Sequence, residues 1–132
     1  MTLLVDSNRF ADLAANNRQA HERLQQASEI WLSIISVGEL LAGFSQGRLR
    51  PENERRLSEL LHLQGVGVLL LDAETPRYYA EVWRALREKG APIPTNDIWI
   101  AAQAIQFDLF LDTSDQHFQH VPGLKLVGSV SQ

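Results

Sequence analysis

The sequence contains no cysteine among its 132 residues. This absence excludes disulfide bonds, thiolate zinc sites and cysteine nucleophiles, and it is typical of proteins in a reducing compartment. No apolar run approaches the ~20 residues that are needed to span a bilayer. The first residues, 1–6, lack the basic segment and the long apolar stretch of a signal peptide. We therefore expect a cytoplasmic protein that has no contact with a membrane.

The sequence also has fewer basic than acidic residues, 12 against 16, and its net charge is −4. An acidic balance argues against a protein that coats nucleic acid, since phosphate contacts need Lys and Arg. The basic residues gather in 48–56 and 77–89, and we interpret both groups as solvated helix faces, with phosphate-backbone contact or a partner surface as the alternative. A hydrophobic content of 45% is enough for a core, so residues 1–132 are predicted to form a single domain.

Short apolar runs alternate with helical patterns along the chain. The predicted strands are 3–5, 30–35, 66–71, 109–111 and, at the sheet edge, 124–127. The predicted helices follow residue 6 and then cover 21–27, 36–44, 51–63, 75–89 and 96–107. This alternation implies right-handed βαβ units. The sequence therefore predicts an α/β fold, a three-layer α/β/α sandwich with a mostly parallel four- to five-stranded sheet.

Four acidic residues lie where an apolar run gives way to a polar turn: Asp6, Glu39, Asp97 and Asp115. Turns that follow parallel strands collect at one edge of the sheet, where ligands bind. Carboxylates gathered there would repel one another unless a cation were present. A hard divalent metal held by oxygen ligands explains the arrangement, and it indicates a metal-dependent phosphodiesterase.

Each acid also has a purely structural interpretation. Asp6 could cap the helix that follows it, and Ser36 with Glu39 matches a capping box. Asp97 and Asp115 could lie in the first turn of a helix, where the helix dipole favours anions. Capping needs no acid in particular, since Ser, Thr or Asn would serve equally well. The presence of an acid at all four places favours the metal site.

The acidic motifs in their order resemble those of a PIN domain, most closely the VapC toxins of bacterial and archaeal toxin–antitoxin pairs. The matching segments are Leu-Val-Asp-Ser-Asn at 4–8, Ile-Ser-Val-Gly-Glu-Leu at 35–40, Asn-Asp-Ile-Trp-Ile-Ala-Ala at 96–102 and Thr-Ser-Asp-Gln-His-Phe at 113–118. The resemblance covers nearly the whole chain, including 121–127. Ser7 stands where the family more often has Thr, which keeps the hydroxyl group.

The resemblance implies a PIN-like fold and an endoribonuclease that depends on Mg²⁺ or Mn²⁺. The residues that it assigns to catalysis and to the metal are Asp6, Glu39, Asp97 and Asp115. Asn8 and Thr113 would be polar groups that orient the acids or a phosphate.

The resemblance also implies partners: an RNA substrate, a cognate VapB-like antitoxin and a second copy of the chain in a homodimer. The antitoxin would lay an apolar segment along the early helices and direct a basic side chain towards the acids. For the homodimer we expect a contact through the helix that carries Tyr78 and Trp83.

Three further residues near the motifs are open to two interpretations. Asp112 is either an additional ligand or a strand-end residue, and we favour the latter. His117 and His120 could bind a metal, but two histidines without further nitrogen or sulfur ligands make a weak site. We therefore predict that His117 packs so as to position Asp115.

Two other functions compete with a ribonuclease. One is a non-catalytic PIN-like scaffold, which the presence of all four acids disfavours. The other is an aspartate-dependent phosphoryl-transfer domain, either a haloacid-dehalogenase-like phosphatase or a receiver. The phosphatase needs a second Asp where this chain has Asn8, and the receiver needs a Lys after its last strand, whereas Lys125 lies within a predicted strand.

Overall fold

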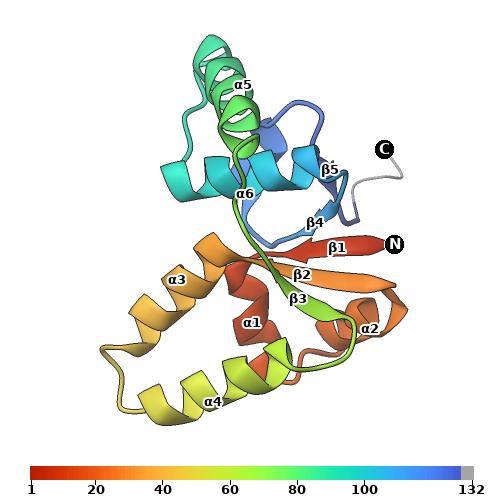
Figure 1. Ribbon diagram of the computed structural model, residues 1–132, viewed down its shortest axis with the longest axis vertical. Helices are drawn as coiled ribbons and strands as arrows, with labels where there is room; N and C mark the ends of the chain where they lie inside the picture. The colour runs from red at the N-terminus through yellow and green to blue at the C-terminus, as the bar shows by residue number, and fades with distance from the viewer. Residues whose placement is uncertain (129–132) are drawn as a thin grey trace.

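The fold is built on a parallel sheet. A computed structural model describes residues 1–128, so the last four residues of the predicted domain lie outside the described part. The strands are β1 (Thr2–Val5), β2 (Glu29–Ser33), β3 (Val66–Leu69), β4 (Phe110–Asp112) and β5 (Lys125–Leu126). They pair in the order β3-β2-β1-β4-β5, and every pairing is parallel (Figure 1). The predicted parallel sheet, with its fifth strand at the edge, is confirmed.

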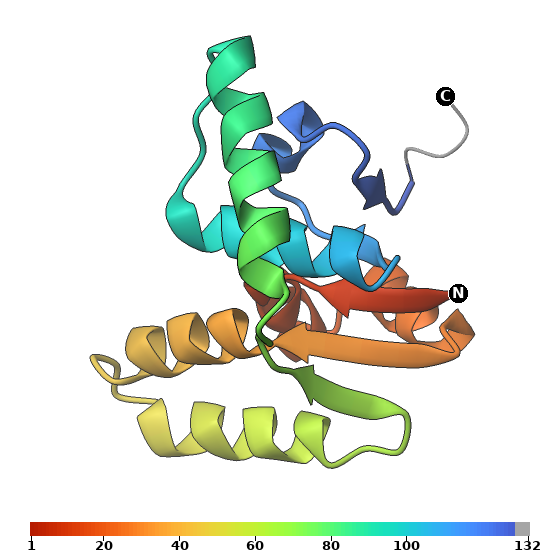
Figure 2. The same ribbon diagram turned by 45° about the horizontal axis from the view of Figure 1, so that its top comes forward.

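Helices cover both faces of this sheet. They are α1 (Ser7–Ala14), α2 (Arg18–Gln26), α3 (Ile34–Phe44), α4 (Arg50–Leu61), α5 (Thr75–Lys89), α6 (Thr95–Gln106) and the short 3₁₀ helix η1 (Gln116–His120). Figures 1 and 2 show α5 and α6 on one side of the sheet and α1, α3 and α4 on the other. The three-layer α/β/α architecture is therefore confirmed. Within residues 1–128, no helix combines the length and the apolarity that crossing a membrane would require.

Each face of the sheet has its own hydrophobic core. On one face, Leu4 and Leu111 of the central strands pack in a cluster with Ile100 of α6 and Leu86 of α5. On the other face, a smaller cluster is formed by Phe10, Leu32 and Leu57. Apolar strands buried on both sides explain why the strand sequences lack strict alternation.

The boundary between β2 and α3 differs from the expectation. The strand ends at Ser33, and Ile34 and Ile35 already belong to the helix. Their β-branched side chains favoured a strand, but the Ser33 hydroxyl accepts a hydrogen bond from the Ile35 amide at 3.1 Å and caps the helix there. The predicted capping box is therefore wrong: Ser36 is buried inside α3, and Glu39 is free of any capping role.

A buried amide fixes α6 against the sheet. Gln103 is fully buried, and its side chain accepts a hydrogen bond from the Ser33 hydroxyl at the end of β2. The same side chain donates to the Leu69 carbonyl of β3 at 3.1 Å. Because buried hydrogen bonds of this kind are costly to break, they hold α6 in a defined position across two strands.

Asp112 ends β4, and its carboxylate forms ion pairs with two arginines. Its carboxylate lies 2.9 Å from the Nε atom of Arg9 and 2.9 Å from the Nε atom of Arg23, and its side chain is 4% exposed. Both oxygens are therefore committed to ion pairs that join α1 and α2 to the sheet. This arrangement supports the interpretation of Asp112 as a strand-end residue rather than as a metal ligand.

We predict that Asp112→Asn lowers the free energy of unfolding by about 2–3 kcal/mol, because it removes the counter-charge of Arg23 and leaves Arg9 paired with Asp12 alone. Urea denaturation in the presence of EDTA measures this change. The matched control is Glu52→Gln, which breaks an exposed ion pair with Arg56 on α4 and should change the free energy by less than ~0.5 kcal/mol. Equal effects of the two substitutions would contradict the structural role of Asp112.

Candidate metal centre

Asp6 lies at the end of β1 and caps α1. One carboxylate oxygen accepts a hydrogen bond from the backbone amide of Ser7 at 2.8 Å, so the helix-capping role is confirmed for this oxygen. The other oxygen accepts hydrogen bonds from the Thr113 hydroxyl at 2.8 Å and from the Asn8 side-chain amide at 3.2 Å. Asp6 is therefore buried and tied to the loop that follows β4, in addition to its cap.

Asn8 and Thr113 connect α1 to that loop. The Asn8 side chain donates to the Thr113 hydroxyl at 3.3 Å and accepts from the Ser114 amide at 3.3 Å. The Thr113 hydroxyl in turn accepts a hydrogen bond from the Asp115 amide at 2.9 Å. Both residues thus contact the acids or their backbone, as expected for groups that orient a metal site.

Glu39 reaches the site from the middle of α3. One carboxylate oxygen accepts a hydrogen bond from the Ser7 hydroxyl at 3.3 Å, and the other accepts from the Asn96 side chain at 3.3 Å. These two donors come from the first turns of α1 and α6. Asn96 belongs to the sequence motif around Asp97, and its contact with Glu39 is a site interaction that the sequence alone did not reveal.

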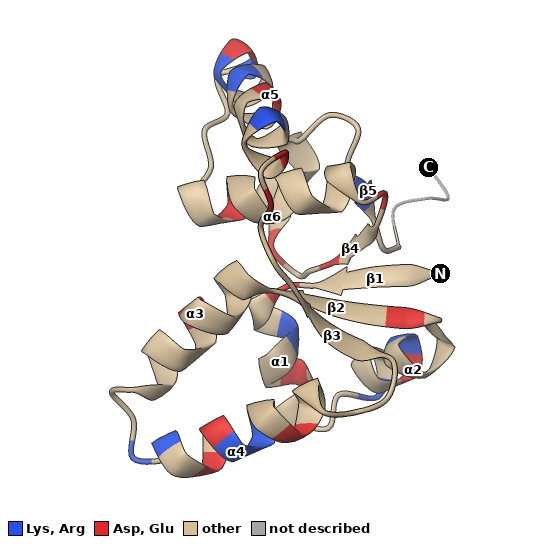
Figure 3. Cartoon of the chain, viewed as in Figure 1, with Lys and Arg blue, Asp and Glu red and all other residues tan. Residues whose placement is uncertain are grey.

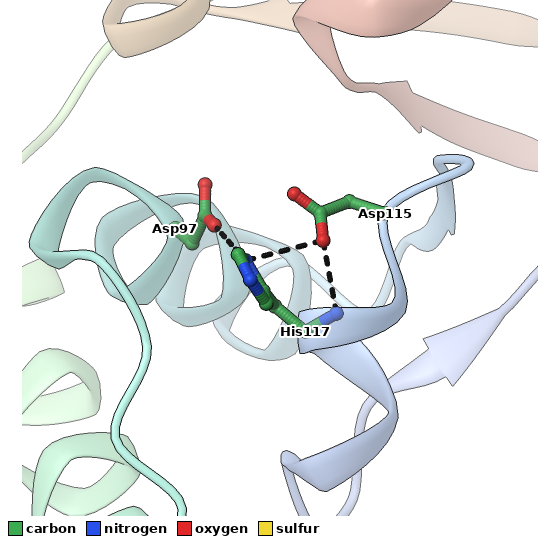
Figure 4. A group of neighbouring side chains, drawn as sticks. All are labelled: Asp97, Asp115 and His117. Carbon is green, nitrogen blue, oxygen red and sulfur yellow. Dashed lines mark hydrogen bonds and ion pairs between the residues drawn. The ribbon is translucent and has the colours of Figure 1, made fainter.

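Asp97 and Asp115 face each other across the site with His117 beside them (Figure 4). Asp97 lies in the first turn of α6, where the helix dipole favours an anion, as its structural interpretation expected, although the helix has no side-chain cap. Asp115 caps η1 by accepting a hydrogen bond from the His117 amide at 2.9 Å. The His117 Nδ1 atom lies 3.2 Å from Asp97 Oδ2 and 3.1 Å from Asp115 Oδ1.

His117 contacts Asp115, as its predicted role requires, but it does so from the surface. Its side chain is 51% exposed, so it is not part of the core. Its backbone amide donates to the Asp115 carboxylate, and its ring nitrogen faces that carboxylate. The structure thus brings one imidazole together with two acids, rather than two histidines.

The pKa values of the two buried acids of the cluster, Asp6 and Asp97, are raised. Burial is the main cause that raises the pKa of Asp6 above its ordinary value, and the charges of Glu39 and Asp115 raise it further. Burial likewise raises the pKa of Asp97, and the charges of Asp6, Asp115 and Glu39 add to this effect. Hydrogen bonds from Thr113 to Asp6 and from His117 to Asp97 oppose the rise in part. The structure therefore brings all four predicted acids into one electrostatic cluster.

The donor atoms present fit a divalent metal ion. Ligand atoms of Asp97, Asp115 and His117 all lie within 4.8 Å of one another, which is compatible with binding to a single ion. Asp6 and Glu39 lie outside this tight group and join it through shared hydrogen bonds. Partly desolvated carboxylates are the ligands that hard cations prefer, and a cation would relieve their repulsion.

We predict that the metal-free protein loses stability as the pH rises through the raised pKa values of Asp6 and Asp97. Both carboxyl groups hold protons more tightly when folded than when unfolded, where the pKa of Asp is about 3.9, so protonation favours the folded state in this window. Asp97→Asn cannot ionise. In EDTA at pH 7 it should raise the Tm by about 2 °C or more relative to the unmodified chain.

Thermal denaturation between pH 4 and 8 in EDTA measures this difference. Asp108→Asn is the matched control, because that carboxylate is 87% exposed and pairs with Lys125 at the surface. The control should follow the pH profile of the unmodified chain. An Asp97→Asn variant whose Tm is unchanged or lower at pH 7 would show that the acids do not destabilise the metal-free fold.

Comparison with known proteins gives matches over nearly the whole chain. The family model of the PIN domain matches residues 3–124. Ribonuclease VapC2 of Rickettsia felis is 30% identical over 120 residues, which cover 90% of this chain and 86% of that protein. In the crystal structure of VapBC2 from Rickettsia felis, bound to a DNA fragment from its promoter, the matching chain has a TM-score of 0.86 and 25% identity, with 96% of this chain and 97% of that chain covered.

A second solved structure, VapBC-1 from nontypeable Haemophilus influenzae, matches with a TM-score of 0.83 and 26% identity over 96% of both chains. Sequence and structure thus agree over nearly the whole length. The chain belongs to the PIN-domain family and, within it, to the VapC ribonucleases.

Proposed function

We propose that this protein is a divalent-metal-dependent endoribonuclease and the toxin of a toxin–antitoxin pair. The observation that carries the proposal is the meeting of four carboxylates from separate segments at the carboxyl edge of the parallel sheet. They are Asp6, Glu39, Asp97 and Asp115. Relatives named ribonucleases cover the same length of chain, which supports RNA as the substrate.

Each residue of the site would have its own role in phosphodiester hydrolysis. Mg²⁺ or Mn²⁺, when bound, would lower the pKa of a water molecule and offset the charge of the phosphate. The four carboxylates would hold the ion and accept the proton of the attacking water. Thr113 would hold Asp6 and the Asp115 backbone in position, and Asn8 would hold Asp6 and the Ser114 backbone, because each already bonds to both of its partners. No nucleophilic side chain is needed for this chemistry.

We predict that the purified chain, free of any partner, cuts labelled total RNA into discrete fragments when Mg²⁺ or Mn²⁺ is added. EDTA should abolish the cleavage. Asp6→Asn and Asp97→Asn should each lower the rate by about 100-fold or more, as the loss of one charge-stabilising group typically does. Asp108→Asn, a carboxylate-to-amide change at an exposed position, should retain the activity.

The outcomes separate the competing functions. Intact RNA together with no calorimetric binding of Mn²⁺ would favour a non-catalytic scaffold. Metal-dependent cleavage by Asp97→Asn at the rate of the unmodified chain would refute the role that we give to Asp97. Trapping of a phosphate analogue such as beryllofluoride on Asp6 would instead favour a phosphoryl-transfer domain.

We further propose that a VapB-like antitoxin binds in an apolar groove between α1, α3 and α4. The matching solved structures are VapBC assemblies, and this chain has a groove of about 380 Å³ on the helices where an apolar segment was expected. The groove is lined by Phe10, Ala11, Ala14, Ala15, Leu40, Phe44 and Asn53. A neighbouring hollow shares Phe10 and Ala14 and adds Arg56 and Glu59 at its rim.

A homodimer through α5 is also part of the proposal. Tyr78 and Trp83 are 36% and 45% exposed on this helix, and the guanidinium carbon of Arg87 lies 4.8 Å from the centre of the Trp83 ring. Exposed aromatic residues with a neighbouring arginine are typical of protein interfaces.

We predict that Ala14→Trp fills the groove and weakens antitoxin binding by about 10-fold or more, which corresponds to ~1.4 kcal/mol, while RNA cleavage by the free chain is unchanged. Titration calorimetry with the cognate antitoxin measures the affinity. Ala42→Trp is the matched control, because Ala42 is an exposed alanine on α3 that does not line the groove. Equal affinities of the two variants would place the antitoxin elsewhere.

A further inference from the structure

We propose that His117 is a nitrogen ligand of the metal centre and biases it towards a first-row transition ion such as Mn²⁺ over Mg²⁺. The inference rests on the proposed function, because it assumes that the acidic cluster holds a divalent ion. It adds a ligand that lies outside the four carboxylates and a selectivity that carboxylates alone would not give.

The distances around the ring suit a shared ion. The Nδ1 atom lies 3.2 Å from Asp97 Oδ2 and 3.1 Å from Asp115 Oδ1. In an octahedral site with bonds of about 2.1 Å, neighbouring ligand atoms lie about 3 Å apart and opposite ones about 4.2 Å apart. All three donor atoms lie within 4.8 Å of one another, so small adjustments would place them around one ion.

The ring has no evident role in the fold. Within residues 1–128, its only hydrogen-bond or ion-pair partners are these two carboxylates. It is half-exposed, while its amide is fixed by the hydrogen bond to Asp115 at the start of η1. The backbone therefore aims an otherwise unused imidazole at the two acids, as Figure 4 shows.

The chemistry of the donor set determines the preference. Mg²⁺ favours oxygen ligands and keeps several waters, so a nitrogen ligand adds little to its affinity. First-row transition ions accept imidazole, and their affinity for sites of mixed nitrogen and oxygen ligands rises from Mn²⁺ onwards. One imidazole among carboxylates therefore discriminates between the two classes of ion. The competing interpretation is a simple ion pair, in which a protonated ring only offsets the charge of the two acids.

Pulsed electron paramagnetic resonance of the full chain loaded with Mn²⁺ tests the inference without relying on activity. The unmodified chain should show a ¹⁴N coupling to Mn²⁺, and His117→Ala should lose it. By titration calorimetry, His117→Ala should weaken Mn²⁺ binding by about 10-fold, the size of effect seen when a supporting group of a metal site is lost, and should change Mg²⁺ binding by less than about 2-fold. His120→Ala, on the same 3₁₀ helix, is the matched control and should match the unmodified chain.

The possible failures can be told apart. Mn²⁺ that binds to the unmodified chain without a ¹⁴N coupling would overturn the inference and leave the proposed function standing. A coupling that persists in His117→Ala, or an equal loss of affinity for both ions, would also overturn it. Absence of binding by either ion would overturn the proposed metal centre itself, and the inference with it.

Discussion

Repulsion between clustered carboxylates is the constraint that shapes this molecule. Asp6 and Asp97 are buried next to each other's charge and to the charges of Glu39 and Asp115. In the absence of a cation, hydrogen-bond donors compensate only in part: Ser7 and Asn96 serve Glu39, Thr113 serves Asp6, and His117 serves Asp97 and Asp115. The hydrogen bonds from Thr113 and His117 oppose the raised pKa values of Asp6 and Asp97 only in part, so a cation would relieve the repulsion that remains.

Such a cluster keeps its geometry only if the elements that carry it are fixed from outside. The polar contacts that fix these elements are made by residues that lie near the acids in sequence, but not by the acids themselves. Asp112 immediately precedes Thr113 and is held by Arg9 and Arg23. Gln103 lies on the same helix as Asp97 and is bonded to β2 and β3. The acids are therefore positioned before any ion binds, which lowers the cost of assembling a coordination sphere.

The sequence predicts local features better than contacts between distant segments. The strands and the places of Asp6 and Asp115 could be predicted because each depends on an apolar run followed by a polar turn, and parallel topology then gathers the turns at one edge. Glu39 and Asp97 lie instead within α3 and in the first turn of α6. The start of α3 was misplaced because the β-branched pair Ile34 and Ile35 favours a strand, while a single cap at Ser33 decides the boundary. The partners of Asp112 come from 103 and 89 residues away, and no local pattern indicates them. The orientation of the His117 ring depends likewise on the hydrogen bond by which Asp115 begins η1.

The distribution of charge bears on how an acidic protein could bind RNA. Figure 3 shows basic and acidic residues side by side on α4 and α5. Several of these arginines form ion pairs one turn away, as Arg50 does with Glu54 and Arg84 with Glu81, so much of the positive charge is locally neutralised. This agrees with the interpretation of both basic stretches as solvated helix faces. Because part of the positive charge on these helices is paired with neighbouring acids, a bound metal would supply attraction for a phosphate where the acids cluster. Substrate binding and catalysis would then depend on the same ion, which reverses the sign of the surface at the point where the phosphodiester must lie.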